Sequence, residues 1–313
     1  MISHALVTGA DGFVGGILTA HLQSAGWRVS GTTRFPDEVH PERIVCDICD
    51  PEQVKNVLNQ TPEITHVFHL AALTHVPNSV QNPALAMRIN VEGTIHIAQM
   101  VRKRFPEARL LLVSSSEVYG PPQRLPQTED HPLNPKNPYA ISKAAADLFG
   151  RFLFESEGAD IMRVRPFNHT GPGQSDQFVL ASFARQIARI EGGGIEPVIH
   201  VGNLDVSRDF LHVRDVVRAY ERLAVDGRAG EAYNVCSGQP RTIREALEGL
   251  LALSESDIRI EVDPARLRPV DVREVRGSHQ KLTDDTGWKP ERSFADLLAE
   301  LLSYWREKEG VAA

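Results

Sequence analysis

The chain has 313 residues, of which 42% are hydrophobic and 24% are charged, and its net charge is -7. These values are typical of a soluble globular protein with room for two closely packed lobes, and the negative charge disfavours nucleic acid and anionic membranes as partners. No apolar run is long enough to cross a bilayer and no basic-then-apolar leader precedes the first strand, so we expect a cytoplasmic protein. The spacing Cys46-Asp47-Ile48-Cys49 lacks the second ligand pair of a zinc site, so we interpret it as chance and predict no metal.

The first half of the sequence alternates between predicted strands and helices. A strand over residues 2–8 leads into glycines at positions 9, 12 and 15, and helical periodicity follows over 17–25. In this order the glycines permit a tight turn and close approach of the backbone to a pyrophosphate, which the helix N-terminus then faces. The sequence therefore predicts a dinucleotide-binding loop. Its predicted cofactor contacts are Gly9, Asp11, Gly12, Phe13, Val14 and Gly15.

The end of the next strand, 27–34, selects the dinucleotide. An acidic residue there would bind the free ribose 2′-OH of NAD, whereas Thr33 and Arg34 supply a hydroxyl and a cation that suit a 2′-phosphate. NADP(H) is the predicted cofactor, and NAD(H) is the alternative if Arg34 is an ordinary surface residue that does not contact the cofactor. Asp47 follows the third strand and is predicted with Ile48 to lie at the adenine, while Asp50 could cap the next helix.

Two further strands are expected to bring small and polar residues to the same edge of the sheet. Strand 65–72 ends in small residues that leave room for a cofactor, strand 110–113 ends at three serines, and a long amphipathic helix over 83–105 separates them. The predicted cofactor contacts here are Leu70, Ala71 and Ala72, and the polar candidates are Ser115 and Ser116.

A tyrosine and a lysine four residues apart begin the next helix, which is predicted over 139–157. Tyr139 and Lys143 would share one face, and the lysine charge is expected to lower the pKa of the phenol toward neutral pH. With Ser115 binding the reacting oxygen, Tyr139 could transfer a proton and Lys143 could hold a ribose hydroxyl. Taken alone this spacing is common on helix surfaces, so the prediction depends on the dinucleotide loop and Ser115 that precede it.

The second half is less regular and is rich in arginine, glycine and proline. We expect a domain border near Pro166, with a cofactor-binding domain over 1–166 and a substrate-binding lobe over 167–313, from which some chain returns to the first domain. The predicted elements are a strand over 160–165, helices over 178–190 and 216–224, a strand over 232–235, and helices over 242–252 and 294–305. The expected fold class is α/β, a Rossmann-type doubly wound parallel sheet with a smaller α/β lobe.

Five motifs resemble those of the extended short-chain dehydrogenase/reductase family, in its nucleotide-sugar branch. They are Thr8-Gly-Ala-Asp-Gly-Phe-Val-Gly15, His69-Leu-Ala-Ala72, Asn90-Val-Glu-Gly-Thr94, Ser114-Ser-Ser-Glu-Val-Tyr-Gly120 and Asn137-Pro-Tyr-Ala-Ile-Ser-Lys143. The resemblance implies an NAD(P)-dependent oxidoreductase whose smaller lobe binds a nucleoside diphosphate. The implied substrate contacts are Ser115, Ser116, Asn168, Arg208, Arg268 and Asp271, with salt-bridged surface arginines as the alternative for Arg208 and Arg268.

Within this family the second half resembles the GDP-6-deoxy-D-mannose reductases, also called GDP-4-keto-6-deoxymannose reductases. The matching segments include Arg165-Pro-Phe-Asn-His-Thr-Gly-Pro-Gly-Gln174, Tyr233-Asn-Val-Cys-Ser-Gly238 and Thr286-Gly-Trp288. This resemblance implies reduction of the 4-keto group of a GDP-sugar by NADPH, giving GDP-D-rhamnose. A 4,6-dehydratase is an alternative function, because related dehydratases carry at the position of Glu117 a carboxylate that removes the C5 proton of the sugar. A 4-epimerase and a non-enzymatic NADP(H) sensor are further alternatives.

The family resemblance also implies an assembly. The helices predicted over 83–105 and 139–157 commonly pair across a two-fold axis in this family, so we expect a homodimer formed through a four-helix bundle.

Overall fold

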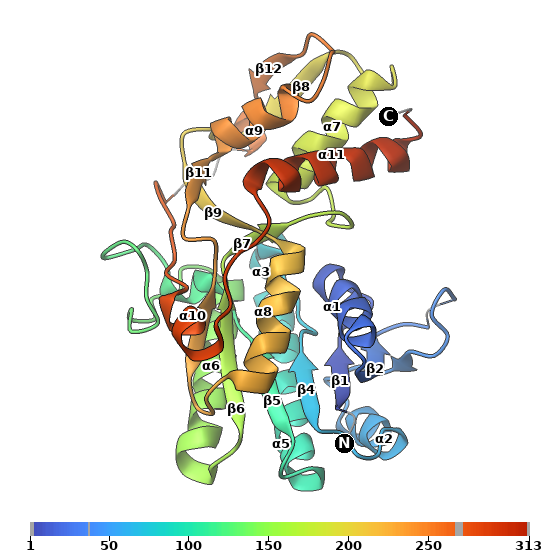
Figure 1. The fold of residues 1–313 in the computed structure, drawn as a ribbon, viewed down its shortest axis with the longest axis vertical. Coiled ribbons are helices and arrows are strands. Elements are labelled where there is room, and N and C mark those ends of the chain that lie inside the picture. The colour runs from blue at the N-terminus through green and yellow to red at the C-terminus, as the bar shows by residue number, and fades with distance from the viewer. Residues whose placement is uncertain (1–2, 37, 267–271, 312–313) are drawn as a thin grey trace.

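A seven-stranded parallel sheet forms the larger part of the computed structural model, which describes residues 3–36, 38–266 and 272–311 (Figure 1). Its strand order is β10-β6-β5-β4-β1-β2-β3. The strands are β1 (His4–Thr8), β2 (Arg28–Thr33), β3 (Ile44–Val45), β4 (His66–His69), β5 (Arg109–Val113), β6 (Ile161–Pro166) and β10 (Ala232–Val235). This arrangement confirms the predicted Rossmann-type fold class. Arg268 and Asp271, two of the predicted substrate contacts, lie outside the described residues.

Helices cover both faces of this sheet, and the strand residues alternate between two hydrophobic layers. Leu111 packs in the layer beneath α1 (Phe13–Ser24) and α8 (Val213–Asp226), whereas its neighbours Leu110 and Leu112 pack beneath α2 (Pro51–Gln60), α5 (Gly93–Arg104) and α6 (Pro138–Glu157). This alternation is what a strand buried on both faces requires. The helices of the larger part are α1 (Phe13–Ser24), α2 (Pro51–Gln60), α3 (Val76–Gln81), α4 (Pro83–Met87), α5 (Gly93–Arg104), α6 (Pro138–Glu157), α8 (Val213–Asp226) and α10 (Gln280–Thr286).

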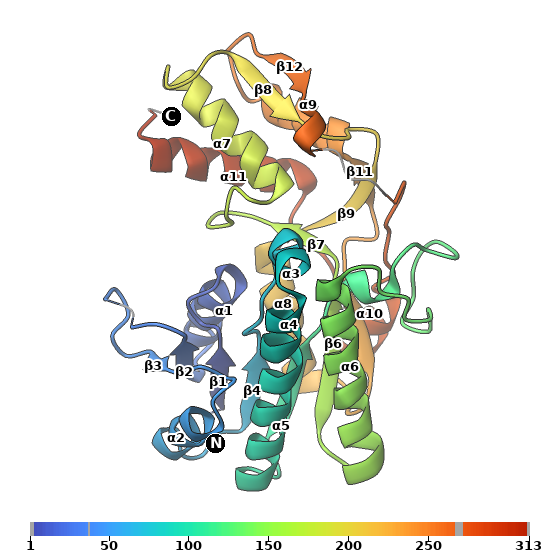
Figure 2. The ribbon, with the colours of Figure 1, turned by 180° about the vertical axis from the view of Figure 1, so that it is seen from behind.

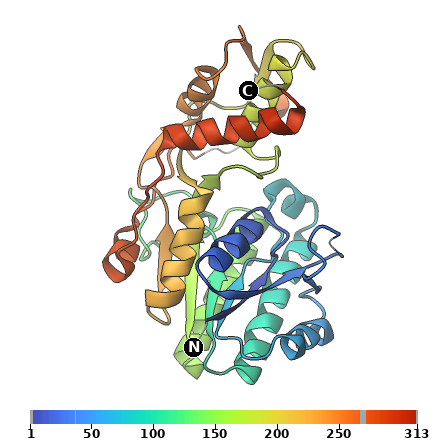
Figure 3. The same ribbon diagram turned by 45° about the vertical axis from the view of Figure 1, so that its right-hand side comes forward.

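A smaller part, at the top of Figure 1, lies over the carboxyl ends of the sheet and has its own core. It holds a three-stranded sheet, β11-β9-β7, and a separate β12-β8 pair. In Figure 3, α11 is seen to cross above α8 and α1. The elements are β7 (Asn168–Thr170), α7 (Val179–Glu191), β8 (Val198–Val201), β9 (Ser207–His212), β11 (Pro240–Thr242), α9 (Ile243–Leu251), β12 (Arg259–Val262) and α11 (Phe294–Glu309).

Chain from beyond residue 167 returns to the larger part. Strand β10 pairs in parallel with β6, with Tyr233 opposite Val164, and α8 packs against α1. Short-range patterns place both elements correctly along the chain, and the predicted strand over 232–235 coincides with β10. Their position beside residues far away in the sequence is a tertiary result.

One predicted helix is interrupted in the structure. The segment 83–105 contains α4, a π-helical turn over Arg88–Glu92 and α5. The turn holds the buried Asn90, whose amide bonds the backbone N and O of Leu73 and the hydroxyl of Ser142. Because π-helical turns often mark functional positions, this turn is relevant to the site: it fixes α6 to the loop that follows β4.

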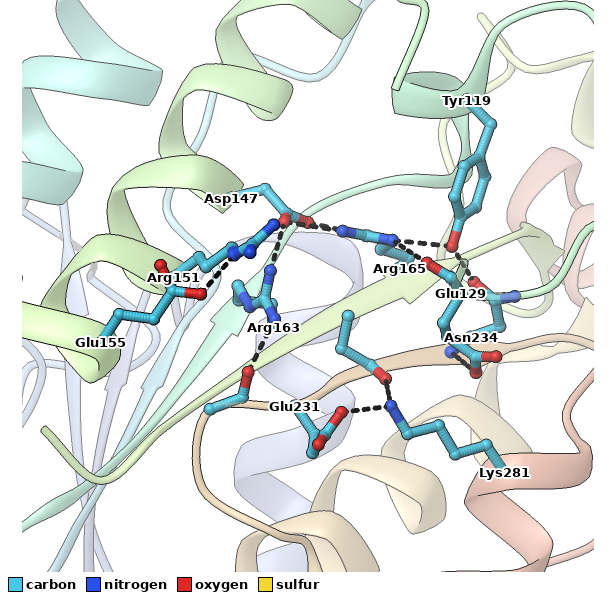
Figure 4. A network of polar contacts seen from close by, with 12 residues as sticks. Tyr119, Glu129, Asp147, Arg151, Glu155, Arg163, Arg165, Glu231, Asn234 and Lys281 are labelled. Atoms are coloured by element: carbon cyan, nitrogen blue, oxygen red, sulfur yellow. Dashed lines mark hydrogen bonds and ion pairs between the residues drawn. The ribbon is translucent and has the colours of Figure 1, made fainter. Parts of the chain in front are cut away.

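Helix α6 is also fixed to the sheet by a buried ion pair, shown in Figure 4. Asp147 has a fully buried side chain and accepts from Nε of Arg165 at 2.8 Å, from Nη2 of Arg165 at 2.8 Å and from Nη1 of Arg163 at 3.2 Å. Arg165 also donates to the Tyr119 hydroxyl at 3.0 Å. Burial alone would raise the pKa of Asp147, but the hydrogen bonds and charges of the two arginines outweigh it and lower the pKa. The network therefore joins α6, β6 and the 3₁₀ turn Ser116–Tyr119.

Within the described residues, none of the helices has the combination of length and apolar character that crossing a membrane requires. The expected cytoplasmic location stays a prediction.

Replacing Asp147 by Asn should destabilise the fold strongly, because two buried guanidinium groups would lose their counter-charge. We expect a loss of about 3–5 kcal/mol in the free energy of unfolding, measured by urea denaturation. Glu155→Gln on the same helix is the matched control, since its pair with Arg151 is about half exposed and should contribute at most about 1 kcal/mol. Equal losses in the two variants would show that the buried pair does not hold α6.

Candidate active site

A cleft of about 1180 Å³ lies at the carboxyl ends of the large sheet and extends beneath the smaller part. Every described residue that the sequence singled out as a site contact lines it. These are Gly9, Asp11, Gly12, Phe13, Val14, Gly15, Arg34, Asp47, Ile48, Leu70, Ala71, Ala72, Ser115, Ser116, Glu117, Tyr139, Lys143, Asn168 and Arg208. Residues from segments up to 199 positions apart thus share one surface.

The glycine loop has the shape that a pyrophosphate requires. Gly9 has φ +71°, and a Cβ there would lie 3.0 Å from the backbone of Ala71; a Cβ on Gly15 would lie 2.0 Å from the oxygen of Gly9. Side chains are therefore excluded at both positions. Helix α1 begins after Gly12 without a side-chain cap, so its first N–H groups are open to an anion. These features fit a dinucleotide.

A chain of hydrogen bonds holds the β4 end against this loop. Thr94 Oγ1 donates to the oxygen of Asn90 at 2.7 Å and accepts from Nε2 of His69, so Nδ1 of His69 accepts from Thr8 Oγ1 at 2.8 Å. The same Thr8 oxygen accepts from the amides of Leu70 and Ala71 at 3.2 Å. Burial lowers the pKa of His69 to about 3, so the ring is neutral and serves as a fixed link in this chain.

The opposite end of the cleft holds the residues predicted to distinguish the two dinucleotides. Thr33 is buried and donates its hydroxyl to the oxygen of Phe35 at 2.9 Å, while the exposed Arg34 lies over the Phe35 ring at 5.3 Å. Asp47 lines the cleft and accepts from the amide of Cys49 at 2.9 Å. Asp50 caps α2, as the sequence suggested, by accepting from the amides of Glu52 and Gln53.

The two nearby cysteines have no features of a reactive pair. Burial raises the pKa of Cys46 to about 12 and that of Cys49 to about 11. Both are free thiols, and the described residues contain no group of three metal-ligating side chains. The interpretation of the C-x-x-C spacing as chance stays a prediction.

Ser115, Tyr139 and Lys143 meet in the cleft near the end of β5. Asn137 caps α6 by accepting from the amide of Ala140 at 2.8 Å, which places Tyr139 in the first turn. Ser115 caps the following 3₁₀ turn. Lys143 is buried and donates from Nζ to the oxygen of Val113, the last residue of β5, at 2.8 Å. The lysine thus joins the helix to the strand end that carries the serine.

The predicted lowering of the Tyr139 pKa is wrong for this structure. Burial raises the pKa of Tyr139 to about 12, and the charge of Glu117 adds to this effect, while the Ser115 hydroxyl opposes it. Burial also lowers the pKa of Lys143 to about 8, from an ordinary value of 10.5. The physical reason is that desolvation disfavours both charged forms, and spacing along a helix does not reveal it. At neutral pH the phenol therefore carries its proton.

Glu117 lies at the rim of this cluster. Its side chain is exposed, and Oε2 accepts from the side-chain amide of Asn137 at 3.3 Å. The carboxylate lines the same cleft as Ser115 and Tyr139. The position of Glu117 therefore fits both a role as a base and no role in the reaction.

The smaller part contributes a second set of polar residues. Asn168 on β7 pairs with Phe210 of β9, which also carries Arg208, so the two predicted substrate contacts come from neighbouring strands. Arg208 donates to the oxygens of Ser207 and Val272 at 2.9 and 2.8 Å. The neighbouring Asp209 is buried and accepts hydrogen bonds from Ser237, Gly238 and Gly277. The alternative of a salt-bridged surface role for Arg208 stays a prediction.

Sequence reasoning missed several residues on this side of the cleft. Arg266 lines it and donates to the Ser182 hydroxyl at 3.4 Å. The arginine-rich segment that begins at Arg266 was the available signal, but it directed attention to Arg268. Other lining residues outside the predicted set include Gln174, Gln177, Phe178, Gly202 and Asn203.

Known proteins resemble the chain over nearly its whole length. The family profile described as GDP-mannose 4,6 dehydratase matches residues 6–301. A GDP-6-deoxy-D-mannose reductase from Pseudomonas aeruginosa is 41% identical over 310 residues, covering 98% of this chain and 99% of that protein. A GDP-mannose 4,6-dehydratase from Yersinia enterocolitica is 28% identical over 346 residues, covering 96% and 92%.

A similar relation holds for the three-dimensional structure. The solved structure described as RMD from Pseudomonas aeruginosa complexed with NADPH is 40% identical in sequence and has a TM-score of 0.88. The match covers 98% of this chain and 99% of that one.

The pKa of Lys143 generates a test that requires no substrate. Between about pH 8 and 10.5 the unfolded chain would bind a proton at this lysine that the folded chain lacks, so the lysine makes stability rise with pH across that window. Relative to Lys143→Met, the free energy of unfolding of the wild-type protein should rise by an amount on the order of 2–3 kcal/mol between about pH 8 and pH 10. Urea denaturation at several pH values measures this difference. A difference between the two proteins that does not vary with pH would contradict the lowered pKa of Lys143 in the folded state.

Proposed function

The chain belongs to the nucleotide-sugar branch of the extended short-chain dehydrogenase/reductase family, and we propose that it reduces GDP-4-keto-6-deoxy-D-mannose to GDP-D-rhamnose with NADPH. The observation that carries this proposal is the convergence of Ser115, Tyr139 and Lys143 at one end of a cleft whose other end is a pyrophosphate cradle. The 41% identity to a reductase, against 28% to a dehydratase, favours simple reduction.

Under this proposal the two ends of the cleft bind different parts of NADPH. Gly9, Gly12 and the N-terminus of α1 would hold the pyrophosphate, and Arg34 would pair with the 2′-phosphate. Asp47 and Ile48 would lie at the adenine. Ser115 and Tyr139 supply polar groups at the reacting end, and apolar residues such as Val113 and Phe167 also line the cleft. When bound, the cofactor supplies the hydride.

The side chains then have separate roles in the reduction. Ser115 would hydrogen-bond the carbonyl oxygen of the sugar, which orients it and stabilises the charge that develops there. Tyr139, protonated because burial raises its pKa to about 12, would donate its proton to the same oxygen as that oxygen becomes an alkoxide. Lys143 would hold a ribose hydroxyl and supply positive charge beside the phenol as it gives up its proton.

The smaller part would bind the rest of the substrate. Asn168 and Arg208 border the cleft from neighbouring strands and suit a diphosphate, because a guanidinium can donate two parallel hydrogen bonds to phosphate oxygens. We extend the set to Arg266, which lines the same surface, while Arg268 and Asp271 stay predictions. The division into a cofactor domain over 1–166 and a substrate lobe over 167–313, with α8 and β10 returning to the former, is part of the same proposal.

Glu117 supports a second candidate, the 4,6-dehydratase. Its carboxylate is exposed in the cleft beside Tyr139, where a base could remove the C5 proton of a sugar. A dehydratase would need this carboxylate, whereas a reductase would not, since its only proton transfer is from Tyr139.

Two substrates assayed side by side distinguish these candidates. With GDP-4-keto-6-deoxy-D-mannose, the protein should oxidise one added NADPH per product, faster than it oxidises NADH. Glu117→Gln should keep this rate within a few fold, because the reduction needs no carbon base. Consumption of GDP-mannose without added reductant, together with a loss of about 10²–10⁴-fold in Glu117→Gln, would instead identify a dehydratase.

Tyr139→Phe tests the proton donor. The change keeps the ring and removes the acidic hydroxyl, so kcat should fall by about 10²–10⁴-fold, while the Kd for NADPH, measured by fluorescence titration, should change by only a few fold. A parallel loss of affinity and turnover would indicate that Tyr139 has a structural role.

We also propose that the protein is a homodimer formed through α6 and its neighbour α4, which lie side by side in Figure 2. Helix α6 exposes a row of large apolar side chains at helical spacing, Ile141, Leu148 and Phe152, with exposed fractions of 46%, 51% and 49%, and Met87 at the end of α4 is 39% exposed. A second copy of the chain, related by a two-fold axis, would bury this face in a four-helix bundle.

The double variant Leu148→Glu/Phe152→Glu should convert this dimer to a monomer, because it places four buried charges at the two-fold interface. Light scattering after size-exclusion chromatography measures the mass. Leu253→Glu is the control, since Leu253 is also exposed, at 41%, but lies on the smaller part. A wild-type monomer, or a variant that remains dimeric, would refute this interface.

A further inference from the structure

A buried tyrosine borders the cleft from the opposite side of the sheet edge. Tyr220 lies on α8, is 0% exposed, and lines the cleft together with Val113, Pro166 and Phe167. Helix α8 packs against β5 and β6, the strands whose ends carry the reacting side of the site. Tyr220 thus belongs both to the hydrophobic layer between α8 and the sheet and to the residues that line the cleft.

The hydroxyl of Tyr220 has no hydrogen-bond partner among the described residues. The other two fully buried tyrosines are bonded: Tyr119 donates to Asn234 at 2.7 Å, and Tyr233 donates to Asp285 at 2.7 Å. Leaving a buried hydroxyl without a partner costs roughly 1–3 kcal/mol. Such a group requires an explanation, and its position on the cleft wall indicates that the partner is a bound molecule.

Tyr220 lies at the reacting end of the cleft. Burial raises its pKa, and the negative charge of an ionised Tyr139 raises it further, which places the two phenols within electrostatic reach of each other. Its hydroxyl therefore stays protonated and can both donate and accept. Val113 packs against the same hydrophobic cluster as Tyr220, and Pro166 and Phe167 line the same cleft, so a flat, mostly apolar ring with one polar substituent fits these apolar residues.

We propose that the Tyr220 hydroxyl hydrogen-bonds the carboxamide of the bound nicotinamide. This inference rests on the proposed function, in which the cleft binds NADPH. The carboxamide is the one polar substituent of the ring, and Lys143 and Tyr139 already account for the ribose and the reacting oxygen. Held by its carboxamide, the ring could not turn over, so Tyr220 would fix which face points toward Ser115. Tyr220 is thus a positioning residue.

Tyr220→Phe tests this assignment because it removes a single oxygen. Isothermal titration should show NADPH binding about threefold to tenfold weaker, the loss expected for one neutral hydrogen bond. Binding of 2′-phospho-ADP-ribose, which lacks the nicotinamide, should be unchanged. Without ligand, the Tm should stay the same or rise, since the variant no longer buries an unbonded hydroxyl.

Tyr233→Phe is the matched control. It removes a hydroxyl that bonds Asp285 and Arg228, so it should lower the Tm without changing the affinity for NADPH. If Tyr220→Phe binds NADPH with wild-type affinity, the assignment is overturned. It is also overturned if the variant binds NADPH and 2′-phospho-ADP-ribose equally more weakly, because that result would indicate a structural role. If the wild-type protein does not bind NADPH, the proposed function itself is refuted. The wild-type measurement alone shows this, so it is distinguished from a failure of the Tyr220 assignment.

Discussion

The contact on which the site depends is the buried ion pair between Asp147 and Arg165. Asp147 lies one helical turn beyond Lys143 on α6, and Arg165 lies on β6. The same guanidinium reaches the hydroxyl of Tyr119, in the 3₁₀ turn that follows Ser115 (Figure 4). Both elements that carry the proposed catalytic groups are therefore fixed to one cation. Desolvation makes such a pair a weak source of net stability, so its value here is geometric: planar, two-point pairing fixes the helix in one register.

Helix α6 combines three roles. Its first two turns present Tyr139 and Lys143 to the cleft, Asp147 follows one turn further along the same buried side, and the outer face exposes Leu148 and Phe152. The π-helical turn at Asn90 adds a further attachment through Ser142. A helix fixed at so many points has little freedom to move when ligands bind, which suits a proton donor that must be in place before the sugar arrives.

Burial determines the electrostatics of the site more than the spacing of its charges does. Desolvation raises the pKa of Tyr139 to about 12 and lowers that of Lys143 to about 8, so at neutral pH the phenol is protonated while the lysine still carries its charge. A neutral phenol is the protonation state that a reduction requires. The hydroxyl of Tyr220 has no hydrogen-bond partner among the described residues, so a ligand that bonds it would gain a hydrogen bond without breaking one within the protein.

The sequence by itself determined the fold class, the glycine loop, and the set of predicted contact residues that line the cleft. These features are local: a strand, a turn and a helix follow one another within residues 4–24, and the order of motifs places each at a strand end. Tertiary structure alone decided the return of β10 to the sheet, the partnership of Asp147 with Arg165, the place of Arg266 in the cleft, and the direction of the Tyr139 pKa shift. Each of these depends on burial or on contacts between distant segments, and neither can be read from spacing along the chain.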